Sequence, residues 1–177
     1  MKDFGLRNDT NGDRNPESYD IGISVIRNVL EAVKRLKDNP EDSDARGVIL
    51  YGASISTSGR LGLGKEENFA YDIYELEFIP EVLYGATYRK SLTTLFPRFL
   101  KAMANCHGSD IRHYFKDAFG YVGSVEESED KMVGLFESLG VDMYFDGEVS
   151  VEAVKEINIA TLLSADEVTD IVKECIR

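Results

Sequence analysis

The sequence predicts an all-α protein, and three observations support this fold class. Apolar residues recur at spacings of three and four over several long stretches, which places them on one face of a helix. Pairs typical of helix starts, such as Ser124 with Glu127 and Ser164 with Glu167, precede two of these stretches. No alternating apolar and polar run leads into a hairpin turn. The 177 residues are enough for one domain with a hydrophobic core.

Residues 1–18 are polar and rich in Asn, Asp and Gly, which predicts a flexible lead-in. Residues 19–177 are predicted to form one helical domain. The first helix is expected from Tyr19, where apolar side chains begin to recur at helical spacing, and Asn39-Pro40 ends it. Asn39 is also predicted to cap a second helix, with Pro40 at that helix's first position.

The second predicted helix contains "GVILYG", which could also be a buried strand by periodicity alone. The charged, capped entry and the length of the segment favour a helix. The remaining predicted helices are Lys65 to Phe78, "SLTTLFPRFLKAMANC", "VEESEDKMVGLFESLG" ended by Gly140, Ser150 through Ile157, and "ADEVTDIVKECIR". Pro97 lies in the fourth helix, "SLTTLFPRFLKAMANC", and is expected to kink it or to begin it.

The net charge of −12 is concentrated from Ser124 onward, where 14 acidic and 4 basic residues lie. Such a field repels phosphate backbones, so we expect no nucleic-acid partner. No apolar run is long enough to cross a bilayer, and the first residues lack the apolar core of a signal peptide. We therefore expect no membrane partner and a cytoplasmic location. Cys106 and Cys175 are expected to be reduced thiols.

The stretch "GRLGLGK" has the glycine and lysine spacing of a phosphate-binding loop, with Gly59, Gly64 and Lys65. That loop requires Ser or Thr after the lysine to hold magnesium, but this chain has Glu66, whose carboxylate would repel phosphate. The loop must also follow a strand within alternating β-α units, which the sequence does not supply. We predict a glycine-rich turn between two helices instead.

Two other polar clusters are weak candidates for metal sites. "DTNGDRNPESYD" spaces oxygen ligands as a calcium loop does, but Arg14 replaces the glycine of the sharp turn and Asp20 the final glutamate. "CHGSDIRH" contains soft and borderline metal ligands within eight residues. A zinc site would need a third or fourth ligand from another part of the chain, and both histidines of the chain are already in this stretch. We interpret it as a connection between helices with polar surface histidines; its candidate ligands are Cys106, His107, Asp110 and His113.

Three carboxylates, Asp72, Glu75 and Glu77, could act as acid and base, or could simply lie exposed on a helix.

Two longer stretches, "NPEDSDARGVILYGASISTSGRLGLGKEENFAYDIYELEF" and "LYGATYRKSLTTLFPRFLKAMAN", resemble the C-terminal helical domain of the iron-containing (group III) alcohol dehydrogenases, especially the butanol dehydrogenase branch. The resemblance covers Tyr19 to Val154 and rests on several matches in the same order. It implies a multi-helix bundle of the dehydroquinate synthase-like C-terminal type. In that family a separate N-terminal Rossmann-like domain holds the phosphates of NAD(P), and this sequence shows no counterpart of it.

The resemblance also implies where the family's divalent metal would lie. The family motif H-x-x-E-H falls on "DIYEL", which places Asp72 at the first histidine, Glu75 at the glutamate and Leu76 at the second histidine. The histidine of the motif H-G-x-G falls on Tyr88. One carboxylate is not a metal site. We therefore expect neither metal nor cofactor on this chain alone.

Three hypotheses for function remain open. The first is a truncated or degenerate relative that is not catalytic alone, with a separate NAD(P)-binding chain as its partner. The second is a protein-interaction or dimerisation module that reuses the helical scaffold, as a homo-oligomer or with another protein. The third is an enzyme with a repurposed pocket lined by Asp72, Glu75 and Tyr88.

Overall fold

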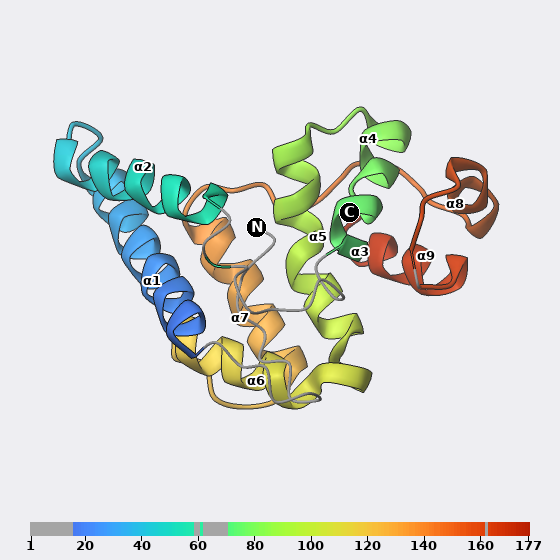
Figure 1. Cartoon of the computed structure of the whole chain (residues 1–177). Helices are drawn as coiled ribbons and strands as arrows, with labels where there is room; N and C mark the ends of the chain where they lie inside the picture. Colours follow the sequence, from blue (N-terminus) through green and yellow to red (C-terminus); the bar gives the residue numbers. More distant parts are fainter. Residues whose placement is uncertain (1–15, 59–60, 62–70, 162) are drawn as a thin grey trace. The chain divides into compact units, whose positions relative to one another are not determined.

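The computed structural model describes residues 16–58, 61, 71–161 and 163–177 (Figure 1). Every regular element in these ranges is a helix, apart from one isolated bridge between Phe145 and Ile176, so the predicted all-α class is confirmed. No helix in this part of the chain is both long and apolar enough to span a bilayer. The α-helices are α1 Pro16–Asp38, α2 Ser43–Thr57, α3 Tyr71–Leu76, α4 Phe78–Tyr84, α5 Tyr88–Ala102, α6 Ala104–Phe119, α7 Val125–Ser138, α8 Val151–Ile157 and α9 Ala165–Lys173.

The contacts divide the chain into two compact units, whereas the sequence predicted one helical domain. Unit 1 contains α1, α2 and residues 108–124, and unit 2 contains residues 68–107 and 125–177. Helix α6 contributes to both units, and its backbone leaves helical geometry at His107, where φ is −127° and ψ is 22°. Most of the predicted lead-in lies outside the described residues, and α1 begins at Pro16.

In unit 1, α1 and α2 lie side by side because one glycine lets their backbones approach (Figure 1). A Cβ atom added to Gly52 would lie 2.7 Å from Val29 Cγ2 and 3.3 Å from Val25 Cγ1. The segment "GVILYG" lies within α2, which confirms the helix prediction.

The turn between α1 and α2 is fixed by Asp42, and the predicted cap at Asn39 is wrong. Asp42 is the N-cap of α2, and its Oδ1 accepts a hydrogen bond of 2.9 Å from the backbone N–H of Ala45. Its carboxylate also accepts two 2.9 Å hydrogen bonds from the Arg35 guanidinium. The N–H of Ala45 and the charge of Arg35 hold the pKa of Asp42 below its usual value. These bonds start the helix three residues later than Asn39-Pro40 suggested.

Unit 2 is organised around α5, which contacts α3, α4, α7 and α9. The helix begins at Tyr88, three residues earlier than predicted, because the Thr87 side chain accepts the backbone N–H of Lys90. It continues through Pro97 and ends at Ala102. The buried cluster of this unit consists of Ile73, Leu76, Ile79, Leu92, Leu95, Phe99, Phe145, Val154, Val168, Ile171, Val172 and Cys175.

The other helix predictions have mixed outcomes. The caps at Ser150 and Ser164 are confirmed, and the Ser164 cap is a complete capping box with Glu167. The third predicted helix is described only from Tyr71, and α4, which ends at Gly85 with φ of +63°, was not predicted.

A buried ion pair joins α5 to α7 in unit 2. Arg98 Nε lies 3.5 Å from Glu129 Oε1, and both side chains are buried. Lys101 Nζ lies 3.7 Å from Glu129 Oε2 and 2.6 Å from Glu174 Oε2, at the edge of the same cluster. Burial raises the pKa of Glu129, although the charges of Lys101 and Arg98 act in the opposite direction.

We predict that Gly52→Ala destabilises the protein by about 1–2 kcal/mol, which is the cost of overpacking less the gain in helix propensity. Gly47→Ala in the same helix is the matched control, because a Cβ there meets nothing within 4 Å. It should stabilise by about 0.5–1 kcal/mol. Chemical denaturation followed by helical circular dichroism measures both changes, and equal effects would contradict the close approach at Gly52.

We predict that Glu129→Ala lowers the free energy of unfolding by about 3–5 kcal/mol, because Arg98 then becomes an unpaired buried cation. Glu174→Ala removes a half-exposed partner of Lys101 and should cost less than about 1 kcal/mol. The same denaturation experiment compares them. A loss in Glu129→Ala no larger than that in Glu174→Ala would argue against a buried pair.

Candidate functional site

The candidate site is the segment of unit 2 to which the sequence resemblance assigns the family's metal-binding motifs. It comprises α3, α4 and the first residue of α5, Tyr88. Asp72 lies in α3, but its side chain is outside the part of the chain that the structure describes. The other matching positions can be assessed one by one.

Leu76, at the position of the family's second histidine, is a core residue. Its exposed fraction is 0%, and it belongs to the buried cluster together with Ile73 and Ile79. A leucine has no donor atom for a metal ion, and its burial is explained by packing.

Glu75 and Tyr88 lie near the surface and have other interactions. Glu75 Oε2 accepts a hydrogen bond of 3.3 Å from the backbone N–H of Ala160, which links α3 to the segment after α8. Tyr88 is 49% exposed at the start of α5. Partial burial raises the pKa of Tyr88, and the charges of Glu77 and Glu81 raise it further. The phenol therefore keeps its proton near neutral pH, which makes it a poor metal ligand.

Glu77 is the unexpected member of this site. It lies between α3 and α4, is only 6% exposed, and its Oε2 has no hydrogen-bond partner within the described chain. Burial raises the pKa of Glu77 to about 7, and the charges of Glu81 and Glu75 add to the effect. The sequence named Glu77 only as a carboxylate that could be exposed. Its burial could have been found from the helical pattern, since Ile73, Leu76, Glu77 and Pro80 follow the i, i+3, i+4, i+7 spacing of one face.

These residues do not fit the metal of the family. No group of three His, Cys, Asp or Glu side chains in the described ranges is arranged to hold a metal ion. One matching position is a buried leucine and another is a protonated phenol, so the donor set needed for iron or zinc is not assembled from them. We derive no reaction step through a metal.

The Cys106 cluster is not a site either. The prediction that "CHGSDIRH" connects two helices is confirmed in part: the stretch lies within α6, and two helical segments meet at His107, where the backbone leaves helical geometry. Cys106 and His113 are exposed, whereas Asp110 is buried, with an Oδ1 atom that lacks a partner among the described residues. Cys106 and Cys175 are both free of disulfide bonds, as predicted.

The remaining candidates from the sequence concern residues that are mostly not described. Gly59, Gly64, Lys65 and Glu66 lie outside the described residues, and so do the first four ligands of the calcium-like loop. The segment that would have to be the strand before a phosphate-binding loop is part of α2, which is the outcome expected for a turn between helices.

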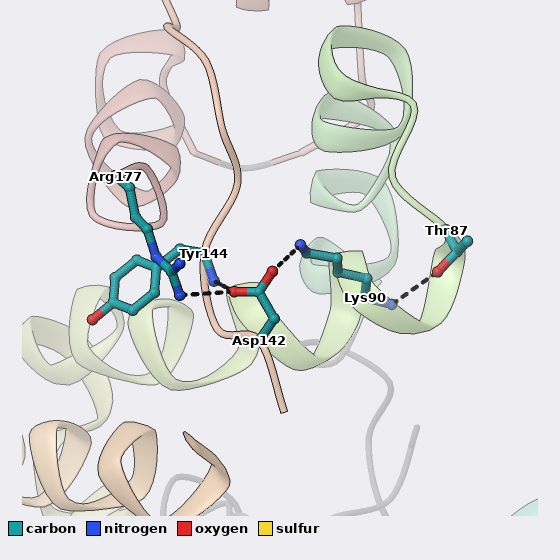
Figure 2. A network of polar contacts seen from close by, with 5 residues as sticks. All are labelled: Thr87, Lys90, Asp142, Tyr144 and Arg177. Carbon is teal, nitrogen blue, oxygen red and sulfur yellow. Dashed lines mark hydrogen bonds and ion pairs between the residues drawn. The ribbon is translucent and has the colours of Figure 1, made fainter. Parts of the chain in front are cut away.

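A polar network lies beside the first turn of α5, next to the site (Figure 2). Lys90 Nζ donates to Asp142 Oδ2 at 2.6 Å, and Arg177 Nη2 donates to Asp142 Oδ1 at 3.0 Å. The Arg177 guanidinium lies 4.9 Å from the centre of the Tyr144 ring. The backbone N–H of Phe145 donates to the carbonyl of Cys175 at 2.7 Å. These contacts attach the C-terminal residues to α5, and we assign them a structural role.

Comparison with known proteins identifies the fold. A scan against protein-family models and a search of curated proteins give no match. Among solved structures, the chain is similar to NADH-dependent butanol dehydrogenase A from Thermotoga maritima, with a TM-score of 0.75, 17% identity, and coverage of 91% of this chain and 46% of that chain. The substrate- and cofactor-free aldehyde reductase YqhD from E. coli gives a TM-score of 0.76 and 16% identity, covering 98% and 49%.

The fold is that of the C-terminal helical domain of the iron-containing alcohol dehydrogenases. The resemblance seen in the sequence is confirmed at this level. The chain spans about half the length of the solved structures that it matches.

We predict that Leu76→Ala lowers the free energy of unfolding by about 2–5 kcal/mol, because it leaves a cavity in the core of unit 2. Tyr88→Ala, at the other matching position, should cost less than about 1 kcal/mol because the side chain is half exposed. Chemical denaturation of the two variants measures this difference. Equal losses would contradict the assignment of Leu76 to packing.

Proposed function

We propose that this chain is a non-catalytic helical domain that binds another protein domain through the surface beside the former metal motif. We define this surface as the α4 face, made of Phe78, Val82 and Tyr88. The observation that carries the proposal is the exposure of these three side chains around a motif whose Leu76 is buried in the core.

The α4 face consists of exposed apolar side chains on α4 and at the start of α5. Phe78 and Val82 are four residues apart on α4 and therefore lie on the same side of the helix, with exposed fractions of 45% and 65%. Tyr88 is the first residue of α5, which packs against α4, and it is 49% exposed. Clustered exposed apolar side chains commonly mark protein-binding surfaces.

The partner that best fits this proposal is an NAD(P)-binding domain of the Rossmann type. The family resemblance implies such a domain beside the helical one, and the solved structures with this fold are about twice as long as this chain. We propose that the α4 face contacts this domain. NAD(P) and any metal would then be held by the assembled protein or by its partner, and the helical domain would contribute the binding surface.

A second copy of this chain is the second candidate partner. The same three exposed side chains favour it, because a symmetric dimer uses one surface patch on both subunits. Sedimentation velocity of the chain alone, over a concentration series, separates this candidate from the first.

We predict that Val82→Glu weakens binding of a separately expressed Rossmann-type NAD(P)-binding domain by at least about tenfold, because it places a charge in an apolar interface. Leu50→Glu is the matched control, since Leu50 is 72% exposed on α2 in unit 1 and should leave the affinity unchanged. Isothermal titration measures both. Unchanged affinity in Val82→Glu would overturn the proposed surface, and concentration-dependent dimers disrupted by Val82→Glu would favour the second candidate.

A further inference from the structure

The buried carboxyl of Glu77 is not used by the proposed binding function and needs its own explanation. Glu77 lies between Leu76 and Ile79, which are both completely buried, and its Oε2 has no partner in the described chain. A buried, unpaired carboxyl is much less costly when it is protonated than when it is charged.

Burial and the two nearest carboxylates oppose the negative charge of Glu77. Glu75 on α3 and Glu81 on α4 are themselves acidic, and the phenol of Tyr88 lies on the adjacent α5. Burial is the largest influence on the pKa of Glu77, and every influence raises it. Charged residues of the packed helices α5 and α8 that do not shift its pKa include Arg89, Lys90, Glu152, Lys155 and Glu156, and Lys90 is paired with Asp142.

The junction of α3 and α4 around Glu77 is a short segment that can unfold locally. Helices α3 and α4 have six and seven residues, too short to be stable without tertiary packing. Hydrogen bonds from Glu77 N–H to the Ile73 carbonyl, 3.2 Å, and from Glu81 N–H to the Glu77 carbonyl, 3.4 Å, connect them. Moving the Glu77 side chain into water therefore disturbs both helices together with Phe78 of the α4 face.

We propose that the protonation state of Glu77 controls the junction of α3 and α4, and we call this control the latch. The neutral carboxyl stays buried and keeps the junction closed. Ionisation of the carboxyl loosens the junction and, with it, the α4 face. Binding through that face is accordingly strongest when Glu77 is protonated. The inference rests on the proposed function only for the role of the face, whereas the opening of the junction is a property of the chain alone.

The sign follows from proton linkage. The folded-state pKa of Glu77 is about 7 and its ordinary value is 4.5. The closed form is therefore fully favoured below the ordinary value, and it loses stability relative to the open form as pH rises toward the folded-state value.

Hydrogen–deuterium exchange of the full chain, corrected for intrinsic amide exchange rates, tests the latch without any partner. Between about pH 5.5 and about pH 8, the protection of amides in residues 71–84 should fall at least about tenfold in the wild type. In Glu77→Gln it should change little, because the side chain is always neutral. Amides of α9 serve as the internal reference and should keep their protection.

Glu81→Gln keeps Glu77 ionisable and provides a second test if Glu77→Gln folds poorly. It removes a negative charge that raises the folded-state pKa of Glu77, so the loss of protection should be smaller and should level off at lower pH than in the wild type, which moves its midpoint down. Constant protection in the wild type, an equal loss in Glu77→Gln, or an unshifted midpoint in Glu81→Gln would each overturn the latch. Failure of partner binding with these exchange results intact would overturn only the proposed binding function.

Discussion

The complete burial of Leu76 against the core of unit 2 is the constraint on which the rest of the site depends. Helical geometry gives the neighbouring side chains their directions once Leu76 faces inward. Glu77 then enters the interior beside it, whereas Phe78 and, one turn later, Val82 are left in contact with solvent. Leu76, the position that the sequence resemblance matches to a metal ligand of the family, is a packing position, and the residues that follow it include the buried acid and the exposed apolar side chains.

The sequence predicts well those features that depend on neighbouring residues. The helical periodicity identified α1, and the charged entry identified α2 as a helix although "VILY" allowed a strand. The caps at Ser150 and Ser164 were found because a capping side chain bonds to the backbone three residues later.

Features that depend on distant residues could not be predicted from a single sequence. The start of α2 was placed too early because two nearby residues, Asn39 and Asp42, both suit a cap, and the side chain of Asp42 bonds to Ala45 N–H and also to Arg35 on α1. Nothing local indicates that Arg98 pairs with Glu129 on another helix. The division into two units, with a break in α6 at His107, has no sequence signal that periodicity would detect. The burial of Leu76 and Glu77 depends on packing against residues far away in the sequence.

The fold and the site give different answers about function, which is common because function resides in particular side chains. The helical framework has the fold of the C-terminal domain of the iron-containing alcohol dehydrogenases, while Leu76, at one matching position, packs in the core and Tyr88, at another, is half exposed. The most direct measurement of this account is the iron and zinc content of the purified chain after exposure to each ion and removal of the excess. The account predicts no stoichiometric metal. One equivalent of bound metal, lost on Asp72→Asn, would contradict it.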